Sequence, residues 1–305
     1  MSSTSDLQQQ DLSLYSDNTP ISQKTLSPNY NSLNLLLNSQ SNKPTWLITS
    51  LIESCLFDTN YINKFTNNPE NSAYTIASPR SHVVFASFIN GSRVYSKLFK
   101  KYLKLDIESH QFHSQAHVKG SLQTLKRGKQ TNGFQFISFL EDGFENWFDT
   151  LINKLEQLRK GTKENRKKIN LFLENPELVL YLQDQSPSHQ QREATNELLS
   201  KLTQLNQLAN VFIVSSSDKQ LLDWSSELNN DLSLIHSDFL LKLVHKSDLI
   251  VQLKALTTGR ADDVTGELKV SRGCLDLTSS IGVDASEKEY IYLANKEGAI
   301  KLFYR

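Results

Sequence analysis

The feature that most constrains this chain is a repeated alternation of short apolar runs with longer amphipathic segments. The apolar runs have strand length and are rich in Val, Ile, Leu and Phe, which is typical of strands buried on both faces. They span residues 33–37, 82–89, 134–140, 169–173 and 211–214. Parallel strands need a long connection between them, and the amphipathic segments are long enough to supply it as helices.

The segments between the runs predict helices over residues 45–57, 93–105, 144–160 and 196–208. The third has the clearest pattern, because apolar side chains recur every three or four residues and Gly161 follows as a helix stop. A strand–helix alternation of this kind predicts an α/β protein with a mostly parallel central sheet flanked by helices.

The pattern changes after about residue 248 into short alternating strands. We expect strands over residues 249–253, 267–271 and 290–293, and a final hairpin that turns at 295–298 into 300–304. A parallel core extended by antiparallel C-terminal hairpins suggests, by fold analogy, a RecA-like fold. We expect residues 1–10 to be disordered and residues 11–305 to form a single RecA-like ATPase-fold domain without a phosphate loop.

Composition excludes several classes of protein. The chain has 33 basic and 33 acidic residues, so its formal charge is zero and its net charge does not indicate a nucleic-acid or membrane binder. Its two cysteines lack metal-ligand spacing, and no apolar stretch approaches the ~20 residues of a membrane span. We see no secretory or transit signal. We therefore expect a cytoplasmic protein that can also be nuclear, and no membrane contact.

The loop after the first predicted core strand argues against nucleotide chemistry. A phosphate loop uses glycines so that consecutive backbone N–H groups can surround the phosphates. Residues 39–45 read Ser-Gln-Ser-Asn-Lys-Pro-Thr and contain no glycine. Pro44 also removes a backbone donor where phosphate would sit, although proline is common at a first helical position. We therefore expect no cofactor.

Two further groups of side chains invite a catalytic interpretation. Glu174 follows the fourth apolar run, where nucleotide hydrolases place a carboxylate, but Asn175, Pro176 and Glu177 read as a helix start, so we favour a structural role. Of the histidines at residues 110, 113 and 117, the last two would share a helix face. A zinc site would also need a third or fourth ligand and an ordered second shell, which the sequence does not show, so we interpret these histidines as solvent-facing. We nominate no catalytic, cofactor-binding or metal-binding residue.

Charge is unevenly distributed although the total is zero. Residues 93–168 carry 16 basic and eight acidic side chains, a local excess of eight positive charges. A phosphate-backbone contact surface is one interpretation, and solvated helix faces and loops are the other. The candidate RNA-binding residues are Lys126, Arg127, Lys129, Arg159, Lys160, Lys163, Arg166, Lys167 and Lys168.

Five segments are distributed over nearly the whole chain: residues 10–17 (QDLSLYSD), 78–89 (SPRSHVVFASFI), 174–178 (ENPEL), 258–266 (TGRADDVTG) and 301–305 (KLFYR). Together they resemble subunit six of the Elongator complex. None of them is catalytic, so they indicate a family without indicating a site.

The resemblance implies a RecA-like subunit without nucleotide motifs. Its partners would be Elongator subunits four and five, in a hetero-hexameric ring, and through the ring the remaining Elongator subunits and tRNA. The ring would bind tRNA near the anticodon and support wobble-uridine tRNA modification by the catalytic subunit. ATP hydrolysis that promotes tRNA release is also attributed to such rings.

One departure weakens direct RNA contact. In RecA-like rings the loops after the fourth and fifth strands line the central opening, and here they would fall near residues 183–192 and 215–238. Neither is strongly basic, and the second holds five acidic residues against Lys219 alone. We expect a non-catalytic accessory subunit. An active RecA-like ATPase and a pure scaffold without RNA contact stay open as alternatives.

Overall fold

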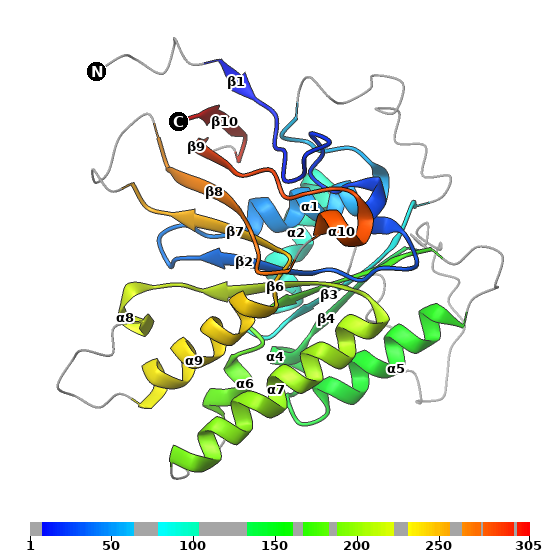
Figure 1. The fold of residues 1–305 in the computed structure, drawn as a ribbon, viewed down its shortest axis with the longest axis vertical. Helices are drawn as coiled ribbons and strands as arrows, with labels where there is room; N and C mark the ends of the chain where they lie inside the picture. Colours follow the sequence, from blue (N-terminus) through cyan, green and yellow to red (C-terminus); the bar gives the residue numbers. More distant parts are fainter. Residues whose placement is uncertain are drawn as a thin grey trace, which may run out of the picture.

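The fold is described from a computed structural model. The described residues are 8–63, 79–103, 133–160, 167–182, 188–222, 231–256, 264–275, 277–295 and 298–305. They form a large sheet with helices on both of its faces (Figure 1). In the described part of the chain, none of the helices is both long and apolar enough to pass through a lipid bilayer.

The sheet has ten described strands in the order β1-β10-β9-β8-β7-β2-β6-β5-β3-β4. Neighbours from β7 to β4 pair in parallel, whereas β7, β8, β9, β10 and β1 pair in antiparallel fashion. The strands are β1 Gln9–Gln10, β2 Leu33–Asn38, β3 His82–Ser87, β4 Phe134–Ser138, β5 Ile169–Glu174, β6 Asn210–Ser216, β7 Leu249–Lys254, β8 Gly266–Arg272, β9 Lys288–Ala294 and β10 Ile300–Tyr304.

Helices fill most of the connections between the parallel strands, as right-handed crossovers require. The α-helices are α1 Thr45–Phe57, α2 Ser92–Tyr102, α4 Phe139–Asp142, α5 Trp147–Arg159, α6 Leu178–Tyr181, α7 Ser188–Leu208, α8 Lys219–Leu222, α9 Asp231–Lys246 and α10 Leu277–Ile281, and Gln23–Leu26 is a 3-10 helix.

Two hydrophobic clusters lie on opposite faces of the sheet. One packs α1, α2 and α10 against one face, and the other packs α5, α7 and α9 against the opposite face (Figure 1). Strand residues alternate between them: Val83 and Phe85 belong to the first cluster, whereas Val84 and Ala86 belong to the second. The parallel strands are therefore apolar throughout because both of their faces are covered.

The predicted class is confirmed at this level: a mixed α/β protein, a large sheet flanked by helices, and antiparallel C-terminal strands. The helix predicted over residues 45–57 has those bounds, and the last hairpin pairs β9 with β10 as expected. Gly298 takes a positive φ of 85° in its turn, a conformation that glycine adopts without strain.

Several boundaries differ from expectation. The third apolar run ends as a strand at Ser138, and its last residues begin the short helix α4. Helix α7 begins at Ser188, eight residues before the predicted start. Residues 231–238, which we assigned to a loop, form the first half of α9. Gln9 and Gln10, expected to be disordered, pair with β10 through Phe303 and Leu302.

Candidate functional site

The loop that joins β2 to α1 follows the first parallel strand, and two of its backbone N–H groups are hydrogen-bonded within the chain. The N–H of Gln40 donates to both carboxylate oxygens of Asp218, at 3.0 and 3.1 Å. The N–H of Asn42 donates to the carbonyl of Ser39 at 3.0 Å. Pro44, which has no N–H, is the N-cap of α1. An acidic side chain of the same chain therefore lies where a phosphate cradle needs free donors.

Glu174 ends β5, and its carboxylate is buried and enclosed by donors. It accepts hydrogen bonds from the hydroxyl of Ser87 at 2.5 Å, from the side-chain amide of Asn90 at 3.1 Å, and from the hydroxyl of Tyr95. The side chain is 3% exposed, and burial raises the pKa of this carboxyl. These contacts join β3, β5 and α2, which supports the structural role that we favoured for Glu174.

Glu177 makes a second buried link at the same edge of the sheet. Its Oε1 accepts hydrogen bonds from Ser215 at 2.7 Å and from the side-chain amide of Asn175 at 3.0 Å. Asn175 has a positive φ of 53°, and the helix that follows, α6, begins at Leu178. The predicted helix start is thus displaced, because Glu177 rather than Asn175 is the N-cap residue.

The sequence-predicted RNA-binding residues are only partly placed by the structure. Lys126, Arg127, Lys129, Lys163 and Arg166 lie outside the described residues, as does the histidine cluster. The prediction of an RNA surface therefore stays a prediction.

The described members of the set lie near the end of α5 and the start of β5. Arg159 and Lys160 are exposed there. Lys167 donates from its ammonium to the carbonyl of Pro79 and is half-buried. Arg159 and Lys160 are consequently the members that a phosphate group could reach directly.

Lys168 corrects the expectation of an exposed cation. Its side chain is buried, and its ammonium donates to the carbonyls of Ser27, at 3.0 Å, and Tyr30, and to Oδ1 of Asn31 at 2.5 Å. Burial, with a contribution from Arg159, lowers the pKa of Lys168 to about 8. This lysine attaches the segment before β2 to the start of β5, so its charge is not available to a phosphate backbone.

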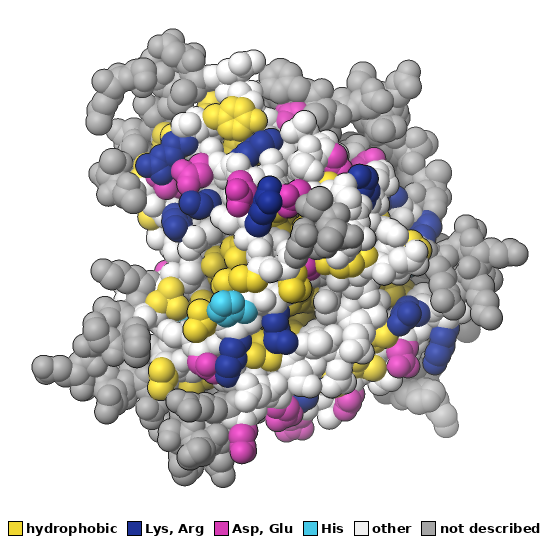
Figure 2. Space-filling model, viewed as in Figure 1, with side chains coloured by type: hydrophobic (Ala, Val, Ile, Leu, Met, Phe, Trp, Pro, Cys, Tyr) yellow, Lys and Arg dark blue, Asp and Glu magenta, His cyan; other side chains and the backbone are white. Residues whose placement is uncertain are grey.

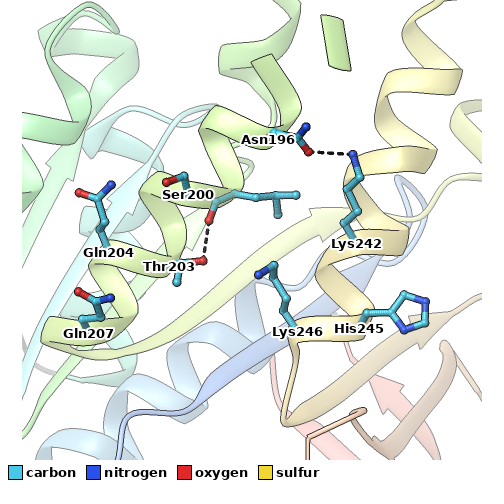
Figure 3. A pocket seen from close by; sticks show the side chains of 9 residues that line it. Asn196, Ser200, Thr203, Gln204, Gln207, Lys242, His245 and Lys246 are labelled. Atoms are coloured by element: carbon cyan, nitrogen blue, oxygen red, sulfur yellow. Dashed lines mark hydrogen bonds between the residues drawn. The ribbon is translucent and has the colours of Figure 1, made fainter. Parts of the chain in front are cut away.

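An open groove of about 600 Å³ runs between α7 and α9. None of the nine described residues that line it is acidic. Figure 3 shows Lys242 on α9 directed toward Asn196 on α7, and its ammonium donates to Oδ1 of Asn196 at 3.0 Å. Lys242 also pairs with Asp238 at 2.7 Å, which offsets part of the positive charge.

The face of the molecule that carries this groove has mixed charge. Figure 2 shows Lys and Arg side chains interspersed with Asp and Glu over it. The long-range attraction expected for nucleic acid is weak over such a mixed surface. In the described part of the chain, no group of three or more His, Cys, Asp or Glu side chains is arranged to hold a metal ion.

A second cavity, of about 320 Å³, lies beside the loop of residues 39–45. It opens between the start of α1, the end of α2 and the β9–β10 hairpin, and aromatic side chains form much of its wall. Sequence reasoning missed it because its aromatic residues come from four distant segments. Proximity to the loop was the one available signal.

The fold and this loop define a class: an α/β protein in which a loop without glycine joins the first parallel core strand to a helix. No family model matches the chain. A Saccharomyces cerevisiae protein named Elongator complex protein 6 is 29% identical over 313 residues, covering 98% of this chain and 99% of that protein. This near-complete match supports the assignment of the chain to the family of Elongator complex protein 6.

Proposed function

We propose that this chain is a non-catalytic subunit of the Elongator complex. The observation that carries the proposal is the match to Elongator complex protein 6 over 98% of the chain, which leaves no large unmatched region for a different activity. In this role the chain assembles with Elongator subunits four and five into a hetero-hexameric ring. The ring binds tRNA and supports wobble-uridine modification, and it lies in the cytoplasm and can also be nuclear.

The RecA-like fold is part of this proposal. It is supported by the six parallel strands from β7 to β4, by the loop after β2 at the edge where these strands end, and by the antiparallel extension through β8, β9 and β10. This step is an analogy at the level of fold, so it indicates a type of architecture rather than an activity.

The assembly is tested by co-expression. The full chain is produced with candidate subunits four and five, and the mass of the purified particle is measured by native mass spectrometry. We expect a particle with two copies of each chain. A chain that purifies alone, with neither partner bound, would contradict the proposal.

A non-catalytic role is supported by the two places where hydrolysis needs free groups. The donor of Gln40 is engaged by Asp218, and the carboxylate of Glu174 is surrounded by hydrogen-bond donors. The alternative, an active ATPase, is tested by ATP turnover of the full chain and of the ring, with and without Lys43→Ala. We expect Lys43→Ala to leave any ATP turnover unchanged, whereas loss of turnover in the variant would make this chain an enzyme.

Contact with tRNA is tested at the exposed end of α5. The double variant Arg159→Glu, Lys160→Glu in the assembled ring reverses two charges, so tRNA affinity should fall and its salt dependence should flatten by up to about two counterions. The matched control is Lys254→Glu, Lys301→Glu, which reverses two exposed charges in the antiparallel part of the sheet. Equal affinities of the two variants and the parent would favour a pure scaffold.

A further inference from the structure

The cavity beside the loop of residues 39–45 has an aromatic wall. Four large rings line it: Trp46 from α1, Tyr61 from the segment after α1, Tyr102 from the end of α2, and Tyr292 from β9. Three of them, all but Tyr292, remain partly exposed. Aromatic rings that are not fully covered at a concave surface are typical of a binding site.

The rings are arranged as pairs. Tyr61 and Tyr102 stack with their centroids 4.8 Å apart and their planes 24° from parallel. Trp46 lies 5.2 Å from Tyr292, with the planes inclined by 45°. Leu98 and Ile300 add aliphatic surface to the wall. The cavity therefore offers flat apolar surfaces to a planar ligand.

Hydrogen bonds to the backbone and to a neighbouring amide fix the tyrosines in place. The hydroxyl of Tyr61 donates to the carbonyl of Trp46 at 3.0 Å, and that of Tyr102 donates to the carbonyl of Gly298 at 3.1 Å. The side-chain amide of Asn42 donates to the hydroxyl of Tyr292 at 2.6 Å. A wall held in this way loses little side-chain entropy when a ligand packs against it.

Trp46, one residue of the cavity wall, has a buried polar atom without a hydrogen-bond partner among the described residues. Among the described residues, no acceptor lies within hydrogen-bonding distance of Nε1 of Trp46, although this atom is buried. A buried N–H that lacks an acceptor costs about 1–3 kcal/mol. A ligand with ring nitrogen or carbonyl acceptors would remove this cost if the indole turned slightly toward it.

Positive charge borders the cavity. Lys43 lines it and is exposed, and the ammonium of Lys101 lies 5.0 Å from the centre of the Tyr102 ring. None of the described lining residues is acidic. Helix α2, which supplies Leu98 and Tyr102, carries four basic residues and no acidic one in its sequence. An anionic group attached to a planar ring would therefore meet favourable charge at the rim.

We propose that this cavity binds a nucleobase that carries a phosphate group. The base packs against the tyrosine and tryptophan rings, and the phosphate lies toward Lys43 and Lys101. A volume of about 320 Å³ is at the small end of ligand pockets, which suits one base rather than a dinucleotide. Stacking of bases on aromatic side chains beside basic residues is a general mode of single-strand recognition.

The same chemistry has two sources, an unpaired base of an RNA strand and a free nucleotide. The inference rests on the proposed function in so far as that function brings RNA to this chain. The loop of residues 39–45 adds little to the binding of a free triphosphate, because the Gln40 and Asn42 donors are engaged and Pro44 has none. A strand can place further phosphates along α2, and we therefore expect RNA to bind more tightly than a free nucleotide.

The experiment uses the full chain and short single-stranded RNA with one 4-thiouridine, crosslinked by light and mapped by mass spectrometry. We expect crosslinks on peptides that contain Trp46, Tyr61 or Tyr102. Tyr102→Leu should weaken RNA binding by about 5- to 150-fold, as the loss of one stacked base does elsewhere. The matched control is Tyr304→Leu, which removes an exposed tyrosine stacked on Tyr290 at the far end of β10.

A second variant keeps the test valid if Tyr102→Leu does not fold. Lys43→Glu alters only the exposed rim, so it should weaken RNA binding while leaving the unfolding transition unchanged.

A parallel experiment adds free AMP or UMP as a competitor of RNA binding. Competition at micromolar nucleotide would identify a free nucleotide as the source, and binding of RNA without such competition would identify the strand; either result supports the site.

Three results would overturn the inference. They are crosslinks confined to other peptides, equal RNA affinity of Tyr102→Leu, Lys43→Glu and the parent, and a partner subunit's side chain filling the cavity in a structure of the ring. Loss of the site while co-purification with subunits four and five persists would leave the proposed function intact. Base binding by a chain that fails to assemble with subunits four and five would support the cavity as a site and contradict the proposed function.

Discussion

The carboxylate of Asp218, in the loop after β6, binds the backbone N–H of Gln40, in the loop after β2, with its two oxygens 3.0 and 3.1 Å from that nitrogen. The two strands are parallel neighbours, so these loops emerge at the same edge of the sheet. A backbone donor of the loop after β2 is thus already engaged by an acidic side chain of the same chain.

The substitution Asp218→Ala should destabilise the protein by about 1 kcal/mol, because it removes the acceptor for Gln40 N–H and for the hydroxyl of Ser216. It should not create ATP binding, since Pro44 and the absence of glycine persist. Urea unfolding and ATP titration measure the two effects. Asp238→Ala, which breaks a partly exposed pair with Lys242, is the control and should cost about 0.5 kcal/mol or less.

Glu174 should give the protein a distinct pH dependence. Burial raises the pKa of its carboxyl above the ordinary value of 4.5, so the folded protein retains a proton that the unfolded chain has already lost. The contribution of Glu174 to the stability of the folded protein is therefore complete below the ordinary pKa of 4.5. It is lost as the pH rises through the raised pKa.

Glu174→Gln cannot ionise and lacks this dependence. The parent's free energy of unfolding, relative to that of Glu174→Gln, should be larger at about pH 5 than at about pH 8, so the parent is relatively more stable at the lower pH. Urea unfolding of both proteins at the two pH values measures the difference, and other titrating groups cancel in the comparison. Parallel changes of the two proteins with pH would contradict the assigned environment.

Lys168→Met should destabilise the protein by about 1–3 kcal/mol, because the carbonyls of Ser27 and Tyr30 lose a shared donor. The tRNA affinity of the assembled ring should not change, since this ammonium is turned inward. Lys160→Met removes an exposed lysine and should alter stability by about 0.5 kcal/mol or less. If Lys168→Met left the unfolding midpoint unchanged and weakened RNA binding, Lys168 would belong to an RNA-binding surface, as the sequence predicted.

Gly273→Ala should be strongly destabilising, by about 2 kcal/mol or more. A Cβ at this position would lie 1.8 Å from the carbonyl oxygen of Ser247, a backbone atom that cannot move without shifting the start of β7. Gly91→Ala is the matched control: its Cβ would meet the end of the flexible Glu141 side chain, and its φ of −78° suits alanine. Thermal unfolding of both variants measures the contrast, and equal losses would contradict it.

The buried core could be predicted from the sequence because its pattern is local. Helix α1 has the predicted bounds, and the strands of the parallel core begin within a residue of where their apolar runs do. Helix α9 was missed because its first turns follow a polar, acidic stretch. The spacing of Ile235, Phe239 and Leu243, four residues apart and buried on one face, was the signal that could have revealed it.

The candidate site was less predictable because its contacts join distant parts of the chain. Lys168 follows other basic residues, and nothing adjacent indicates that its acceptors lie 137 to 141 positions earlier. Tyr61, Tyr102 and Tyr292 stand far apart in sequence and are brought together by packing of α1, α2 and β9. Periodicity reports which face is buried, but it does not report which residue lies across from it.

The central sheet separates two packing layers that have no buried side chain in common. Substitutions on the α1–α2 side and on the α5–α7–α9 side should therefore combine with little coupling between them. Over evolution, one helical layer could be fixed by permanent neighbours in an assembly while the other changed to suit a new surface. In such a fold, the sequence of one helical layer can change while the packing and the interface of the other layer are kept.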